Sequence, residues 1–280
     1  MENLVENEKL YWIDNLRAIA TIGVIILHVS GPLTYQFGTI VNSWWWVGNI
    51  FNSIVRGSVP LFLMVTGALL LPKEYDLSTF LKKRFLRVLI PFFFWGLIHI
   101  VMNLGLKIHS GEVHNTSDAL SNISSKLSSG IAFHYWYIYL IIGIYLFLPI
   151  IGKWVRNSSK NEILYFLTLW IIVTFLSQTQ VSEFRYFSQI TYYFSGSLGF
   201  VVLGYYLTKY PVFEKNKMSF CILSTSLSIA LLFTIIGTFY LSNLSGKSDQ
   251  TLYSYFTLNV IIVTICTFLI FNIFVTTQPL

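Results

Sequence analysis

The sequence predicts an all-α polytopic membrane protein, a single bundle of about eight transmembrane helices with both termini in the cytoplasm. Of its 280 residues, 55% are hydrophobic and only 11% are charged, and the mean hydropathy is +0.65, far from the composition of soluble domains. Apolar stretches long enough to cross a bilayer recur near residues 13–34, 46–71, 88–106, 134–152, 162–180, 189–208, 219–241 and 253–275. We therefore expect one membrane-embedded domain over residues 1–280.

The distribution of Lys and Arg sets the orientation of the predicted helices. With the N-terminus inside, the inner connections hold eleven basic residues, namely Lys73, Lys82, Lys83, Arg84, Arg87, Lys153, Arg156, Lys160, Lys209, Lys215 and Lys217. The outer connections hold four, namely Lys107, Lys126, Arg185 and Lys247. This bias explains the net charge of +6, so the lipid bilayer is the expected partner and nucleic acid is not. The predicted location is a cell membrane, which the chain crosses several times.

Other features exclude alternative classes. The first eight residues are acidic, whereas a cleavable signal peptide starts with basic residues, so we expect the first apolar segment to remain in the protein. Cys221 and Cys266 lie in predicted spans without a CxxC pattern, and neither a disulfide framework nor a metal site is indicated. The long polar connection at 107–133 is predicted outside, either as a cover over a substrate groove or as a solvated connector.

The first apolar segment carries Arg17 and His28. Eleven residues amount to about three helical turns, so both side chains share one face and lie about 16 Å apart along the axis. Asp14 stands three residues before Arg17, where it can cap the helix or pair with the guanidinium. Two interpretations remain open: a functional pair, or an Arg17 that anchors the helix at the headgroups and a His28 that forms an interhelical hydrogen bond.

The second apolar segment carries Arg56 far from either end. Insertion of an arginine at the centre of a span costs about 2.5–3.5 kcal/mol, so a partner inside the bundle or a wet cavity is expected. Pro60 frees a backbone carbonyl and predicts a kink. Gly57, Ser58 and Gly67 permit close helix approach or a ligand-lined surface. We expect a functional Arg56, supported structurally by Pro60 and Gly67.

Arg84 and Arg87 share a face at the start of the third span. With Arg17 on the same side of the membrane, their guanidinium groups suit a phosphate clamp. The positive-inside rule explains the same cluster equally well.

The fourth span opens with the aromatic run His134, Tyr135, Trp136 and Tyr137. Aromatic residues at this depth often form an interfacial belt. The functional alternative is stacking against a sugar face, which makes His134, Trp136 and Tyr137 candidate substrate-binding residues.

These motifs, taken in order, resemble those of the acyltransferase family 3 membrane O-acyltransferases. The run 11–20 followed by His28 is similar to that family's signature, which is Arg or Lys, ten residues, then His. Residues 56–67 resemble its second-helix motif. Arg84-x-x-Arg87 with Pro91 is similar to its arginine-pair motif. Residues 134–137, with Tyr145 and Pro149, resemble its fourth-helix block. The resemblance covers about the first 150 residues and continues weakly over 194–206.

The resemblance implies an enzyme that moves an acetyl or other short acyl group from acyl-CoA to a hydroxyl of a cell-envelope saccharide or lipid-linked sugar. Acyl-CoA is then a donor substrate, and no bound cofactor is expected. Arg17, Arg84 and Arg87 are expected to hold the CoA phosphates, His28 to act as general base, and Arg56 to stabilise the oxyanion.

The end of the chain departs from the family pattern. Family members carry further helices with a late Ser-Phe-x-Ile-Tyr-Leu-x-His-Pro-like motif, whereas this sequence stops at Gln278-Pro279-Leu280. We therefore expect a shortened protein or a fragment. Two rival functions stay open: a transporter or flippase that uses Arg56 and His28 as an ion relay, and an inactive remnant. The sequence predicts no oligomeric state.

Overall fold

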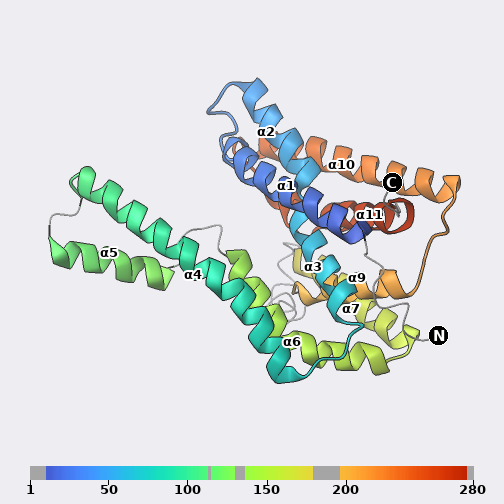
Figure 1. The fold of residues 1–280 in the computed structure, drawn as a ribbon. Coiled ribbons are helices and arrows are strands. Elements are labelled where there is room, and N and C mark those ends of the chain that lie inside the picture. The colour runs from blue at the N-terminus through green and yellow to red at the C-terminus, as the bar shows by residue number, and fades with distance from the viewer. Residues whose placement is uncertain (1–10, 113–114, 130–135, 179–195, 276–280) are drawn as a thin grey trace. The chain divides into compact units, whose positions relative to one another are not determined.

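The computed structural model describes residues 11–112, 115–129, 136–178 and 196–275 (Figure 1). Within these ranges the regular structure is helical, with no strand, which confirms the predicted all-α class. The helices are α1 (Tyr11–Thr34), α2 (Asn42–Val55), α3 (Ser58–Leu70), α4 (Leu77–His109), α5 (Thr116–Ser129), α6 (Trp136–Asn157), α7 (Lys160–Gln178), α9 (Leu198–Lys209), α10 (Lys217–Ser245), the 3-10 turn η3 (Thr251–Tyr253) and α11 (Leu258–Phe274).

Seven helical segments of the described chain are long and apolar enough to cross a membrane, with α2 and α3 counted as one segment and η3 with α11 as another. The predicted span 189–208 is represented by α9, which has 12 residues and is shorter than the others. The connection 107–133 differs from expectation because it contains α5, a helix built mostly from Ser, Thr, Asn and charged residues. The helix α5 therefore gave no signal to a search for apolar stretches.

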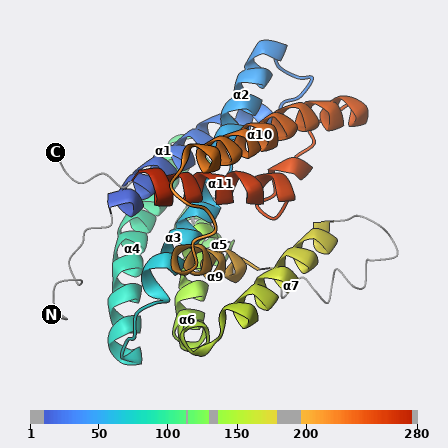
Figure 2. The same ribbon diagram turned by 90° about the vertical axis from the view of Figure 1, so that its right-hand side faces the viewer.

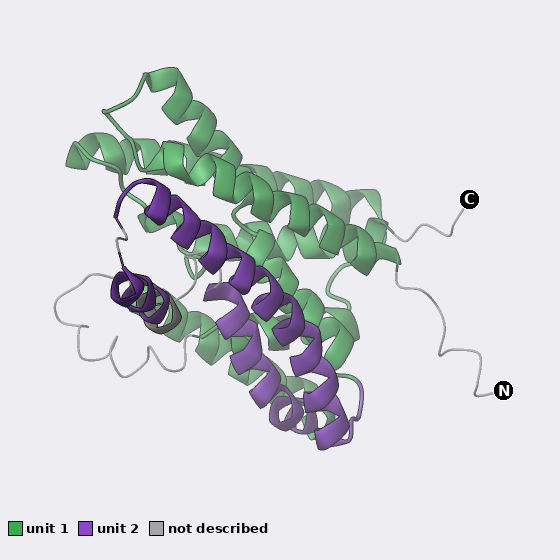
Figure 3. Ribbon diagram, turned by 60° about the vertical axis from the view of Figure 1, so that its left-hand side comes forward, with its two compact units in different colours: residues 1–72, 155–280 green, residues 73–154 purple. Residues whose placement is uncertain are grey.

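The helices group into two compact units, coloured separately in Figure 3. Unit 1 contains residues 1–72 and 155–280, and unit 2 contains residues 73–154. In unit 1, α1, α2, α10 and α11 lie side by side (Figures 1 and 2). This unit contains Arg17, His28 and Arg56, whereas Arg84 and Arg87 belong to unit 2.

Glycines allow α3 and α9 of unit 1 to pack backbone against backbone. A Cβ atom on Gly67 would overlap the carbonyl oxygen of Val201, and a Cβ atom on Gly204 would overlap that of Met64. Helices in lipid gain little from apolar burial against one another, so close contact through small residues supplies much of their attraction. Gly67 thus lies at a close helix crossing, and its supporting role for the site stays a prediction.

Hydrogen bonds to the carbonyl of Thr34 join the end of α1 to two other elements of unit 1. Trp45 Nε1 on α2 donates to this oxygen at 3.2 Å. Ser248 Oγ, in the connection between α10 and η3, donates to it at 2.8 Å. The carbonyl has no helical partner because Thr34 ends the helix, and these donors satisfy it while they fix the positions of α2 and η3.

Unit 2 is built on α4 and α6. Asp76 caps α4 because its side chain accepts a hydrogen bond from the Thr79 backbone N at 2.9 Å, and this bond lowers the pKa of the exposed carboxyl group. Ring contacts join the two helices: Phe92 with Tyr139, centroids 5.8 Å apart, and Phe80 with Tyr145, 6.3 Å apart.

The α3–α9 crossing predicts a large difference between two glycine substitutions. Gly67→Leu should destabilise the protein by about 1–3 kcal/mol, because the side chain overlaps the α9 backbone. The control is Gly105→Leu on α4, where a Cβ atom meets nothing within 4 Å. Thermal unfolding of the detergent-solubilised protein measures both. Equal melting temperatures for the two variants would contradict the crossing.

Candidate active site

The site begins at the break between α2 and α3, where the chain runs through Arg56 and Gly57. Pro60 was predicted to kink this span, and it occupies the first turn of α3, where the missing N–H costs nothing. Gly57 lies against α11, because a Cβ atom there would be 3.1 Å from Thr264 Oγ1 and 3.3 Å from Val263 Cγ1. The break therefore holds Arg56 close to the segment that leads into α11.

The Arg56 guanidinium has partners on two elements. Its Nε donates to the carbonyl oxygen of Tyr253, and its Nη1 donates to Asn52 Oδ1 at 3.3 Å. Its Cζ lies 5.2 Å from the ring centroid of Tyr253 and 4.9 Å from that of Tyr255, within cation–π range. These bonds use two of the five N–H groups of an arginine, so three remain for a ligand.

No carboxylate lies within ion-pair distance of Arg56 in the part of the chain that the structure describes. The partners that the structure describes for this half-buried cation, a carbonyl, an amide and two aromatic rings, carry no formal negative charge that would neutralise it. Such a group attracts anions strongly because the low local dielectric weakens screening. The arrangement is therefore suited to bind a negative group or to stabilise one that forms during a reaction.

Asn52 connects Arg56 to the segment of α1 that carries His28. While its Oδ1 accepts from the guanidinium, its Nδ2 donates to the Leu27 carbonyl at 3.4 Å and to Ser30 Oγ at 3.2 Å. Asn52 and Ser30 are buried, and His28 is half-buried. Asn52 thus links the Arg56 guanidinium to the turn of α1 that carries His28.

Further polar residues extend this network. The Tyr253 hydroxyl donates to Asn49 Oδ1 at 2.5 Å, and the same oxygen accepts from Ser53 Oγ at 3.3 Å. Asn49 Nδ2 donates to the Ile235 carbonyl on α10 at 3.0 Å. The sequence interpretation missed Asn49, although this residue shares one face of α2 with Asn52, Ser53 and Arg56 at i, i+3, i+4 and i+7. That polar stripe on an apolar helix was the available signal.

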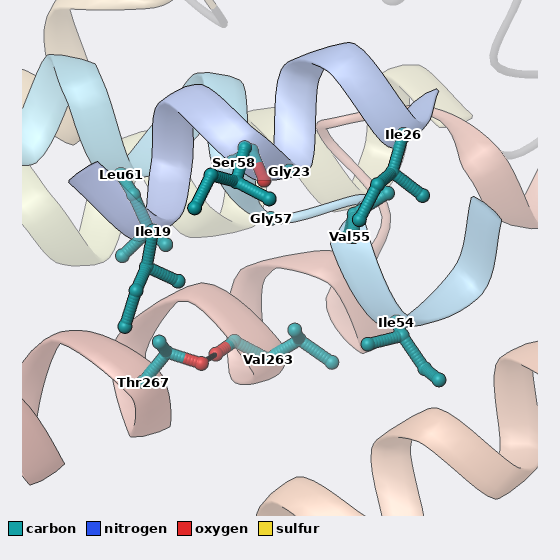
Figure 4. A pocket seen from close by; sticks show the side chains of 11 residues that line it. Ile19, Gly23, Ile26, Ile54, Val55, Gly57, Ser58, Leu61, Val263 and Thr267 are labelled. Atoms are coloured by element: carbon teal, nitrogen blue, oxygen red, sulfur yellow. Dashed lines mark hydrogen bonds between the residues drawn. The ribbon is translucent and has the colours of Figure 1, made fainter. Parts of the chain in front are cut away.

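A groove of about 180 Å³ adjoins the break (Figure 4). Its walls come from α1, α2, α3 and α11, and Figure 4 shows Gly23 and Ser58 together on one side and Thr267 across the groove. Most of the lining is aliphatic: Ile19, Ile22, Ile26, Ile54, Val55, Leu61 and Val263. The groove accommodates a narrow apolar group beside the residue that follows Arg56.

The ion pair predicted between Asp14 and Arg17, at the start of α1, is present in the structure. Arg17 Nη1 lies 3.7 Å from Asp14 Oδ1, and both side chains are exposed. An exposed pair of this kind contributes little to stability, so Arg17 keeps its charge available to an anionic ligand.

The predicted residues of unit 2 occupy α4 and α6. Arg84 is half-buried with its Cζ 5.8 Å from the ring centroid of Phe80, and Arg87 is exposed. Trp136 and Tyr137 form the first turn of α6, with edge-to-face rings 6.2 Å apart. His134 lies outside the described residues. The roles assigned to these residues stay predictions.

Comparison with protein families decides the class of this chain. The model of acyltransferase family 3, described as an acyltransferase domain, matches residues 10–278. The chain belongs to this family. The match extends over both units and past the N-terminal motifs that carry the resemblance. No curated protein and no solved structure matches the chain significantly.

The network around Arg56 makes the Tyr253 hydroxyl a stabilising group. Tyr253→Phe should lower the free energy of unfolding by about 1 kcal/mol, since it removes the buried bond to Asn49. Tyr240→Phe, on the exposed face of α10, is the control and should change nothing. Denaturant unfolding in detergent gives both values. A Tyr253→Phe variant as stable as the control would remove this bond from the network.

Proposed function

We propose that this acyltransferase moves an acetyl or other short acyl group from acyl-CoA to a hydroxyl group of a cell-envelope saccharide or its lipid-linked precursor. The observation that carries the proposal is the Arg56 cation, which has no carboxylate partner among the described residues and is tied through Asn52 to the helix of His28. Membership in the family supports acyl transfer in general. It favours this function over the rival transporter.

The chemistry needs a base and an oxyanion donor. In the proposed reaction His28 takes the proton of the acceptor hydroxyl, whose oxygen forms a bond to the thioester carbon. The carbonyl oxygen becomes negative, and the remaining N–H groups of Arg56 bind it. The C–S bond then breaks, and the proton passes from His28 to the CoA thiolate. An imidazole suits both proton transfers because its pKa ordinarily lies near neutrality.

The groove beside Gly57 supports the donor side of the proposal. Its aliphatic walls match the acyl group and the thin pantetheine arm of acyl-CoA, and the arm needs an apolar path between helices to reach Arg56. A cavity of about 150 Å³ holds a six-carbon ring, so about 180 Å³ suits a short chain. In the proposal Arg17, Arg84 and Arg87 bind CoA phosphates.

The acceptor is proposed from the resemblance. The N-terminal motifs are similar to those of the enterobacterial common antigen O-acetyltransferase, which favours an envelope saccharide. Trp136 and Tyr137 would stack against the sugar, together with His134. This assignment concerns acceptor binding, so its failure would leave the chemistry at His28 and Arg56 intact.

The proposed base predicts loss of activity in His28→Ala. Transfer of labelled acetyl groups from acetyl-CoA to envelope saccharide should fall by at least about 100-fold, with unchanged expression and membrane insertion. His109→Ala, at the exposed end of α4, is the matched control. Retained transfer in His28→Ala would refute the assignment. Gradient-driven uptake into vesicles without acylation would instead support transport.

The proposed phosphate clamp predicts a KM effect. Arg84→Ala with Arg87→Ala should raise the KM for acetyl-CoA about tenfold and leave kcat nearly unchanged, because the lost contacts act equally in ground and transition states. Lys82→Ala with Lys83→Ala removes the same charge from the same turns and serves as the control. An equal KM in both double variants would leave the arginine pair as a topology signal alone.

A further inference from the structure

Two connections that are far apart in sequence meet in unit 1 around one tyrosine ring. Lys160 at the start of α7 and Lys209 at the end of α9 place their Nζ atoms 5.6 Å and 5.4 Å from the ring centroid of Tyr210. Lys209 Nζ also donates to the Tyr205 hydroxyl at 2.9 Å. That hydroxyl donates in turn to the Val155 carbonyl at 3.4 Å. We call Lys160, Lys209, Tyr205 and Tyr210 the two-lysine cluster.

The two ammonium groups are not neutralised within the described chain. Neither Lys160 nor Lys209 forms an ion pair with a carboxylate of these residues. Glu162, the nearest acid in sequence to Lys160, is already engaged, because its Oε2 accepts from the backbone N of Ser159 at 2.6 Å and from its hydroxyl at 2.8 Å. The Lys160 and Lys209 side chains are exposed, whereas Tyr205 is buried. The cluster therefore presents two positive charges and their hydrogen-bond donors to a ligand.

The positive-inside rule does not by itself explain why the two lysines lie around the Tyr210 ring. The positive-inside rule predicts lysines in both connections, yet it does not require them to converge on one ring. Here the tyrosine rings hold the ammonium groups through cation–π contacts and limit where they point. Lysine binds phosphate as a point charge. The cluster thus has the chemistry of a phosphate site, and both connections are predicted on the cytoplasmic side, where acyl-CoA is found.

We propose that the two-lysine cluster binds the nucleotide phosphates of the acyl-CoA donor. The inference rests on the proposed function for the identity of the donor, and it adds a site in unit 1 to the arginines already considered. Its ligand class is a nucleotide that carries several phosphates. An anionic lipid headgroup also carries a phosphate, and the second test below distinguishes it from the acyl-CoA donor.

The first test measures binding without turnover. Calorimetry on the 280-residue protein in phosphatidylcholine nanodiscs gives the Kd for adenosine 3′,5′-bisphosphate. Lys160→Gln with Lys209→Gln should raise this Kd about tenfold, and Lys160→Arg with Lys209→Arg should restore it. Lys247→Gln, on an exposed residue of the opposite predicted side, should leave it unchanged. We call the variant with both Lys160→Gln and Lys209→Gln the glutamine pair. If its Kd equals that of the wild type, the proposal is overturned.

The second test uses two donors and two lipid compositions. The glutamine pair should raise the KM for acetyl-CoA but not for S-acetylpantetheine, which lacks the nucleotide phosphates. Equal effects on both donors would contradict the site. Phosphatidylglycerol in the nanodiscs should not compete with the bisphosphate, and competition that disappears in the glutamine pair would assign the cluster to lipid. If the wild type binds the bisphosphate but transfers nothing, the proposed function fails while this site stands.

Discussion

The charge of Arg56 is the constraint around which unit 1 is arranged. A guanidinium among apolar helices is stable only if its surroundings replace the hydrogen bonds of water. Here the replacement comes from the Tyr253 carbonyl, from Asn52 and from two tyrosine rings. These partners place two elements next to Arg56. Tyr253 belongs to η3, directly before α11, and Asn52 belongs to α2. Gly57 lies against Val263 and Thr264 of α11 at the break, and this close contact holds Arg56 near the segment that contains Tyr253.

Small residues supply the packing that this arrangement requires. Gly67 lies against the backbone of Val201 on α9, while Gly57 lies against the side chains of Val263 and Thr264 on α11 and Gly23 against that of Ser58. Such contacts leave little freedom for sliding, because dense packing resists small displacements. The glycines therefore define the position of the Arg56 junction as well as the walls of the groove beside it.

Hydropathy predicted the spans well because it measures the property that the bilayer selects. The first predicted stretch, 13–34, corresponds to Tyr11–Thr34, and the last, 253–275, corresponds to Thr251–Phe274. It missed α5, whose polar composition hides its helix, and it gave no warning that the second span divides at Arg56. Apolar residues such as Ile54, Val55 and Leu61 outnumber the polar ones around that division, so a window average passes over it.

The sequence predicts that a polar site surrounds Arg56, but it identifies only some of the residues that form this site. A central arginine requires partners, and the spacing of Asn49, Asn52 and Ser53 on its own helix identifies the nearer ones. Tyr253 lies 197 residues away, and no local spacing connects it with Arg56. The consequence is mechanistic, since Asn52 bonds both the guanidinium and the backbone beside His28. One amide side chain therefore links the guanidinium to the turn of α1 that carries His28, and a shift of α1 against α2 would strain these hydrogen bonds.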